Sequence, residues 1–253
     1  MNRLKQIKLI RDKLNRGEYS IGSWIQIPHA SIAEIMGQSN YDWVAVDMEH
    51  GAVTVQQLPD LFRALELGNT LPLARLSQGG VKECKQALDA GAGGVIVPMV
   101  ENSVQVEEIY KAICWPPTGT RGVAFSRANL FGKHFDRYVE EAQQPFLVVM
   151  IENIKAVENL ESILSVKGID ALLIGPYDLS SSMGLTAQFD NPKFNTVIQE
   201  ILQICNKYNI PCGDHLVEPS SSTLKQRVSD GYKFIAYSMD SVFLNHISQR
   251  PSI

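Results

Sequence analysis

Eight short apolar runs alternate along this chain with amphipathic segments of helical length, and this alternation limits the fold more than any other feature. The runs cover residues 20–27, 43–48, 71–76, 94–100, 146–151, 171–174, 210–216 and 234–239 of the 253 residues. Apolar runs of this length, bounded by Gly and Pro, are typical of strands buried on both faces of a parallel sheet. Right-handed crossovers through eight such units predict an α/β fold, a closed (β/α)8 TIM barrel. A doubly wound open sheet is the alternative, but no G-x-G-x-x-G turn follows the first run.

The predicted barrel occupies residues 1–253 as a single domain. An amphipathic helix over residues 1–14 precedes the first run. Further helices are expected over 31–38, 54–68, 80–90, 103–114, 154–165, 192–208 and 241–249, with Thr54 capping the second of these. The segment 115–144 is long and irregular, and it is the only place where the alternation lapses.

The composition predicts a soluble cytoplasmic protein. The net charge of −4 and the lack of clustered Lys and Arg argue against nucleic-acid binding. No run approaches the roughly 20 apolar residues that a membrane span requires, so no membrane association is expected. Four scattered cysteines, without Cys-x-x-Cys pairs or zinc-type spacing, predict reduced thiols: Cys84, Cys114, Cys205 and Cys212.

Charged side chains follow four of the predicted strands. His50, with Asp47 before it, follows the second strand; Arg75 lies near the end of the third; Glu152 follows the fifth and Asp178 the sixth. Because barrel enzymes carry their catalytic residues at the carboxyl ends of the strands, these side chains are expected to converge although they are far apart in sequence.

Together these residue types suit enolate chemistry. Two carboxylates on neighbouring strands suit a hard divalent cation such as Mg²⁺ or Mn²⁺, and Arg75 offers forked donors to a carboxylate or an oxyanion. His50 is the natural proton carrier, and Asp47 could orient its ring. Each residue taken alone more commonly caps a helix, pairs at the surface or packs in the core, so their joint placement carries the prediction. None of the eight runs contains Lys, which disfavours a Schiff base.

Five motifs, in this order and spacing, resemble the HpcH/HpaI aldolase family. They are VDMEHG at 46–51, VPMVEN at 97–102, PPTGTRGV at 116–123, IE at 151–152 and IGPYDLS at 174–180. The resemblance runs over about residues 21–240 and implies a metal-dependent (β/α)8 barrel. Such enzymes cleave or form the carbon–carbon bond of 4-hydroxy-2-oxo acids, with pyruvate as one partner and an aldehyde as the other. The stretch 121–132 is most similar to the branch that handles sugar-derived acids, near the 2-dehydro-3-deoxyglucarate and 4-hydroxy-2-oxoheptanedioate aldolases.

The resemblance also implies a role for each residue of the site. Glu152 and Asp178 would bind a divalent metal, Mg or Mn with Co as a further candidate, which holds the pyruvate carboxylate and keto oxygen. Arg75 would steady the enolate oxygen, and His50 with Asp47 would relay the proton of the 4-hydroxyl.

Further positions are implied for the substrate and for a neighbouring subunit. The backbone around Gly175, Pro176 and Tyr177 would hold the substrate carboxylate, with Pro contributing no donor. His215 and Tyr237 replace small apolar residues of the aldehyde pocket. Family members are usually homohexamers, trimers of dimers that exchange C-terminal helices, and two residues match positions that reach a neighbouring subunit's site: Asp89 and Arg121.

Two departures from the family pattern lie near the metal. Met150 stands where most relatives have a Gln that binds water, and a thioether is at best a weak acceptor. Tyr177 stands where Ser or Ala is usual. Two alternatives to an aldolase therefore stay open: a related lyase or decarboxylase using the same enolate, of the citryl- or malyl-thioester type, and a catalytically weakened binding barrel.

Overall fold

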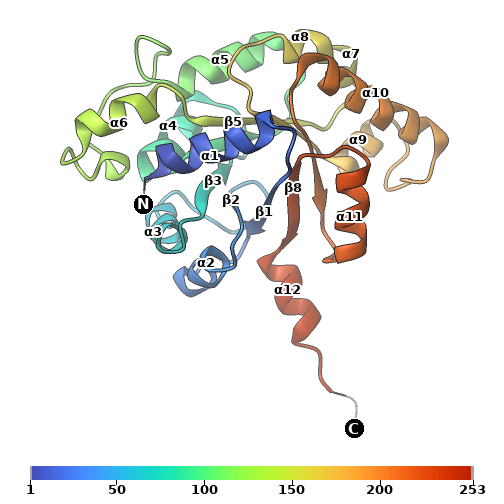
Figure 1. The fold of residues 1–253 in the computed structure, drawn as a ribbon, viewed down its shortest axis with the longest axis horizontal. Helices are drawn as coiled ribbons and strands as arrows, with labels where there is room; N and C mark the ends of the chain where they lie inside the picture. Colours follow the sequence, from blue (N-terminus) through green and yellow to red (C-terminus); the bar gives the residue numbers. More distant parts are fainter. Residues whose placement is uncertain (1, 252–253) are drawn as a thin grey trace.

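The computed structural model describes residues 2–251 as a closed barrel of eight parallel strands in sequence order (Figure 1). The predicted (β/α)8 barrel is therefore confirmed. The strands are β1 Ser20–Ile25, β2 Trp43–Asp47, β3 Leu71–Arg75, β4 Gly94–Val97, β5 Phe146–Ile151, β6 Ala171–Ile174, β7 Cys212–Leu216 and β8 Phe234–Met239. Met1, Ser252 and Ile253 of the predicted domain lie outside the described residues.

Alternate side chains of each strand point into the barrel and fill it. Trp43 stacks on Phe234 at 4.3 Å between ring centroids, and Trp24 meets Trp43 edge to face. Gly22 leaves the room for this, since a Cβ there would come within 2.1 Å of the Trp43 ring. Helix α1, Arg3–Asn15, covers the end of the barrel where the strands begin, and it adds three side chains to this inner core: Ile7, Ile10 and Leu14 (Figure 1).

A second apolar layer lies between the outer face of the strands and the surrounding helices. The α-helices that follow the strands are α2 Ala30–Gly37, α3 Leu58–Leu67, α4 Val81–Ala90, α5 Ser103–Ile113, α7 Ile154–Glu158, α8 Leu160–Leu164, α9 Pro176–Ser182, α10 Pro192–Tyr208 and α11 Ser221–Ser229. Because apolar layers cover both faces of the strands, polar side chains gather at the carboxyl ends of the strands.

Several predicted boundaries differ from the structure. Helix α3 begins at Leu58 rather than at Thr54, because the Gln57 side chain accepts a hydrogen bond from the Thr54 N–H at 2.8 Å and closes a turn there. The helix expected over 154–165 is interrupted at Asn159. Three α-helices were not predicted: α9, α11 and, within the irregular segment, α6 Phe135–Ala142, which follows the short 3-10 helix η1 Arg127–Asn129.

The segment around η1 and α6 is tied to α1 by buried ion pairs. Arg3 contacts Glu141 at 2.6 Å and Glu66 at 3.0 Å, and Glu66 also pairs with Arg127 at 2.8 Å. The long irregular segment is thus held on the helix that covers the amino end of the barrel.

The last helix, α12 Asp240–Ile247, extends away from the barrel instead of packing on it (Figure 1). Asp240 is its one buried residue, while Leu244 is 41% and Ile247 81% exposed. Among the described residues, no helix has the length and apolar character that a membrane crossing would need.

Candidate active site

The residues predicted for catalysis and metal binding lie at the carboxyl end of the barrel: Asp47, His50, Arg75, Glu152 and Asp178. Asp47 and Arg75 are in register as the last residues of β2 and β3, while Glu152 directly follows β5. Asp178 lies in the first turn of α9, not in the expected loop. A cavity of about 220 Å³ separates these elements, and it is lined by Trp24, Gln26, His50, Arg75, Met150, Glu152, Ile174, Gly175, Pro176, Tyr177, Asp178, His215, Val217 and Met239.

A two-point ion pair fixes the arginine. Arg75 Nε donates to Asp47 Oδ1 at 2.8 Å and Nη2 donates to Oδ2 at 2.5 Å, with both residues buried. Burial alone would raise the pKa of the Asp47 carboxyl, but the hydrogen bonds and charge of Arg75 outweigh it and the pKa falls below its usual value. The guanidinium carbon also lies 4.5 Å from the centre of the Trp24 ring. Arg75 is therefore a rigid positive charge at the cavity wall.

The ring of His50 is not oriented by Asp47, which differs from the expectation. Asp47 Oδ1 accepts the backbone N–H of His50 at 3.2 Å, and the ring itself is 62% exposed. The nearest acid to its Nε2 is Glu49, whose Oε2 lies 4.0 Å away. His50 thus borders the cavity with a ring that is free to turn toward a ligand.

The Glu152 carboxylate is buried and held at one oxygen. Its Oε2 accepts the Met99 N–H at 2.8 Å, where Met99 has a left-handed φ of 53°. Burial raises the pKa of Glu152 to about 7; the Met99 hydrogen bond opposes this, and the charges of Glu49 and Asp178 add to it. Gly175 makes room for this side chain, since a Cβ there would lie 2.6 Å from Glu152 Oε1.

These carboxylates fit a divalent cation. Glu152 and Asp178 both line the cavity, and Glu49 Oε2 is buried nearby without a hydrogen-bond donor. Burial raises the pKa of Glu49; the charge of Arg75 opposes this, and the charges of Asp47 and Asp178 add to it. No group of three metal-ligating side chains occurs within residues 2–251. Oxygen ligands of this kind suit Mg²⁺ or Mn²⁺ and leave positions for water and substrate.

The predicted seat for the substrate carboxylate is only partly available. The Gly175 N–H already donates to Ile151 O at 3.1 Å. Pro176 opens α9 without a donor, so the unpaired first-turn amides are those of Tyr177 and Asp178. Tyr177 is 54% exposed, and its ring meets Phe189 edge to face at 5.0 Å.

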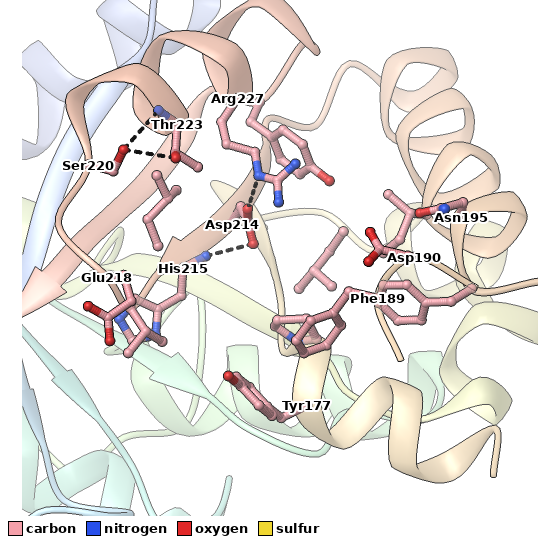
Figure 2. Close-up of a pocket in the computed structure, with 17 residues that line it drawn as sticks. Tyr177, Phe189, Asp190, Asn195, Asp214, His215, Glu218, Ser220, Thr223 and Arg227 are labelled. Carbon is pink, nitrogen blue, oxygen red and sulfur yellow. Dashed lines mark hydrogen bonds and ion pairs between the residues drawn. The ribbon is translucent and has the colours of Figure 1, made fainter. Parts of the chain in front are cut away.

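His215 stands between this cavity and a larger one of about 420 Å³. Figure 2 shows the second cavity, in which Asp214 accepts the His215 N–H at 2.9 Å and pairs with Arg227 at 2.7 Å. Burial, reinforced by the charge of Arg75, lowers the pKa of His215 to about 4, so the ring is neutral at pH 7. Its Nε2 is buried without a partner.

Three further predicted residues do not join the cavity wall. Tyr237 points to the outer face of β8, where its ring lies 6.2 Å from that of Phe243, because strand alternation from the inward Phe234 turns it outward. Asp89 pairs with Arg121 at 3.4 Å, and Arg121 is buried against Tyr138 at 3.1 Å; the predicted role of both at a neighbouring subunit's site stays a prediction.

Sequence reasoning missed Gln26 and Trp24. Both belong to the first apolar run, and their spacing of two residues puts them on one face, which is the signal that would have identified them. Met150, the departure noted above, lies in the cavity wall as an inward residue of β5.

Comparisons with known proteins place the chain in one family. Residues 20–246 match the family model described as HpcH/HpaI aldolase/citrate lyase. The chain is 33% identical over 241 residues to a hydroxypyruvate/pyruvate aldolase of Roseobacter denitrificans, covering 94% of this chain and 93% of the relative. It is 33% identical to a 2-keto-3-deoxy-L-rhamnonate aldolase of Salmonella gallinarum, covering 92% and 87%. A solved HpcH/HpaI aldolase/citrate lyase family protein from Burkholderia cenocepacia superposes with a TM-score of 0.88 at 26% identity, covering 98% of this chain and 96% of that one.

Proposed function

The chain is an aldolase of the HpcH/HpaI aldolase/citrate lyase family, and we propose that it cleaves and forms 4-hydroxy-2-oxo acids, with pyruvate and an aldehyde as the products of cleavage. One observation carries the proposal: Arg75, Glu152 and Asp178 face a single cavity at the carboxyl end of the barrel. A fixed positive charge, together with a pair of carboxylates that would hold a divalent cation, suits a 2-oxo acid whose keto oxygen gains negative charge during the reaction.

Glu152 and Asp178 are the residues that would hold the divalent cation. When bound, such an ion acts as a Lewis acid that polarises the keto group of the substrate. Met99 and Gly175 support the arrangement, the first by a hydrogen bond to Glu152 and the second by leaving space for it. Mg²⁺ and Mn²⁺ are the first candidates, with Co²⁺ as a third.

Arg75 stabilises the charge that appears during cleavage. As the bond between C3 and C4 breaks, its electron pair moves to C3 and the keto oxygen becomes an enolate oxygen. Because Asp47 accepts from Nε and from one N–H of Nη2, the donors that remain are the second N–H of Nη2 and Nη1, which lies 3.4 Å from Glu49. A donor fixed before the reaction stabilises developing charge without the cost of reorientation.

His50 takes the proton of the 4-hydroxyl. Loss of that proton allows the C4 oxygen to become the aldehyde carbonyl as the bond to C3 breaks, and a proton is then delivered to C3 to give pyruvate. The exposed ring of His50 at the cavity edge suits this exchange with solvent.

The aldehyde portion is assigned to the side of the cavity that carries His215 and Tyr177, both of which also line the second cavity (Figure 2). A neutral His215 with a free Nε2 suits a hydroxyl group, and the relatives named above include an aldolase of a deoxy sugar acid. We therefore propose a sugar-derived 4-hydroxy-2-oxo acid as substrate.

The test is release of pyruvate from a panel of such acids, followed by a coupled lactate dehydrogenase assay. Release should disappear in excess EDTA, return with Mn²⁺ or Mg²⁺, and be absent in the Glu152→Gln, Asp178→Asn double variant. Full turnover in EDTA would contradict the metal site. Decarboxylation of oxaloacetate without cleavage of any 4-hydroxy acid would instead favour the related lyase or decarboxylase.

We also propose a homo-oligomer, a hexamer built from dimers that exchange α12. The support is that α12 leaves its own barrel with Leu244 and Ile247 exposed, and burial of apolar side chains is the usual reason for such contacts (Figure 1). Light scattering of the wild type and of Ile247→Glu tests this, with a smaller assembly expected for the variant. The predicted cytoplasmic location stays a prediction.

A further inference from the structure

A glutamine lies directly behind the ion pair of the site. Gln26 follows β1 and lines the cavity. Its Nε2 donates to Asp47 Oδ2 at 3.0 Å, and its Oε1 accepts from Ser241 Oγ at 3.0 Å. Both ends of the amide are therefore used, in a residue that makes no ion pair itself.

The Asp47 carboxylate accepts five hydrogen bonds, one of which comes from Gln26. Oδ1 accepts from Arg75 Nε and from two backbone N–H groups, those of Glu49 at 3.1 Å and His50 at 3.2 Å. Oδ2 accepts from Arg75 Nη2 and from Gln26 Nε2. Within the described residues, Gln26 is thus the only side chain besides Arg75 that donates to this carboxylate. Without it, Oδ2 has Arg75 as its sole partner.

Ser241 determines which way the amide faces. An amide presents an acceptor at one end and a donor at the other, and a hydroxyl donating to Oε1 leaves the NH2 group toward Asp47. Ser241 is in the first turn of α12, where the Asp240 carboxylate accepts the N–H groups of Gln26 and Ile27, both at 2.9 Å. The end of β1 and the start of α12 are therefore one hydrogen-bonded unit.

We infer that Gln26 is a positioning residue, which orients Arg75 through Asp47, and that Ser241 fixes the sense of its amide. The hydrogen-bonded series Ser241, Gln26, Asp47, Arg75 links the first turn of α12 to the guanidinium in the cavity. Its catalytic consequence rests on the proposed function, in which Arg75 stabilises the enolate oxygen. Partners that orient a group next to the reacting atoms commonly matter almost as much as the group itself.

Three variants test the inference, with Gln199→Leu on the exposed face of α10 as the matched control. Gln26→Leu removes the donor at similar size, and kcat of pyruvate release should fall roughly 10- to 100-fold with little change in KM. Ser241→Ala should cost about fivefold, the effect of one ordinary hydrogen bond. Gln199→Leu should match the wild type.

Gln26→Glu separates positioning from packing. It is isosteric, but it places a carboxylate 3.0 Å from Asp47, among the charges of Asp47, Arg75 and Asp240. Its kcat should be lowest at high pH and recover as the pH falls, because the protonated carboxyl can again donate to Asp47. A pH profile parallel to that of the wild type would overturn the inference.

A second readout does not depend on activity. Arg75 lies over the Trp24 ring, so the ¹⁹F resonance of Trp24 in protein labelled with 5-fluorotryptophan reports movement of the guanidinium. Gln26→Leu and Ser241→Ala should shift this resonance, whereas Gln199→Leu should not. An unshifted resonance together with kcat within twofold of the wild type would overturn the inference. If the wild type itself releases no pyruvate, the proposed function fails, and the resonance still decides whether Gln26 positions Arg75.

Discussion

Replacing Gly175 with alanine will displace the Glu152 carboxylate and weaken metal binding. The new Cβ would lie 2.6 Å from both Cγ and Oε1 of Glu152, whereas carbon atoms in contact are separated by about 3.5 Å. Glu152 must therefore move by about 1 Å, which breaks its hydrogen bond to the Met99 N–H. A misplacement of this size costs on the order of 100-fold in function, or about 3 kcal/mol.

The backbone does not explain such a loss, because Gly175 has a φ of −98° that alanine also adopts. Mn²⁺ affinity, measured by isothermal titration, and pyruvate release should both fall by that factor, while the melting temperature changes little. Gly184→Ala is the control: its φ is 70° and no atom lies within 4 Å of the new Cβ, so it should lose stability but keep Mn²⁺ affinity. Mn²⁺ affinity of Gly175→Ala within twofold of the wild type would refute the assignment of Glu152 as a ligand.

Three further predictions follow from the same contacts. Arg75→Lys keeps the charge but loses the two-point bond to Asp47, so kcat should fall about 100- to 1000-fold with KM nearly unchanged in steady-state assays. The folded-state pKa of His215 is lowered to about 4 from 6.5, so as the pH falls the unfolded chain binds the proton first. The free energy of unfolding in urea, compared with that of His215→Leu, should therefore rise by up to about 3 kcal/mol from pH 4 to 6.5 and then stay level. Identical pH curves for the two proteins would contradict this. Arg3→Ala leaves Glu141 without its buried partner, while Glu66 keeps its ion pair with Arg127, and should cost about 3–5 kcal/mol in urea unfolding, with site geometry judged by unchanged KM.

The barrel could be predicted because strands that are buried on both faces require continuous apolar runs in the sequence. Helix α11 was missed for the opposite reason: none of its residues is buried, so it carries no apolar stripe. Helix α11 therefore depends on tertiary context that the local pattern does not contain. Helix α6, by contrast, carries an apolar stripe at helical spacing, formed by Phe135, Tyr138, Val139 and Ala142, so the sequence of the segment 115–144 did contain the signal for it.

The site was partly predictable for the same reason. The ends of the predicted strands locate Asp47, Arg75 and Glu152. Tyr237 was expected in the aldehyde pocket, although strand alternation counted from the inward Phe234 already places it on the outer face of β8. The link between Gln26 and Ser241 spans 215 residues, and no local rule connects them. A single sequence identifies which residues reach the end of the barrel, while the hydrogen bonds that orient them depend on the closed fold.

The Asp47–Arg75 pair controls the charge balance of the site, and this role is separate from any contribution to the stability of the fold. Asp47, Glu49, Glu152 and Asp178 contribute four carboxyl groups against one guanidinium, so a free arginine would be drawn to Glu152 and Asp178 and would occupy the place of a cation. The two short bonds to Asp47 prevent this, since the Arg75 fork is already paired at 2.8 and 2.5 Å. Arg75 stays at the wall, where its third nitrogen faces Glu49 at 3.4 Å, and the negative charge of the other two carboxyl groups remains available to a divalent ion. A buried pair that contributes little net stability can therefore be required by the chemistry, because it keeps opposite charges of one small site from neutralising each other.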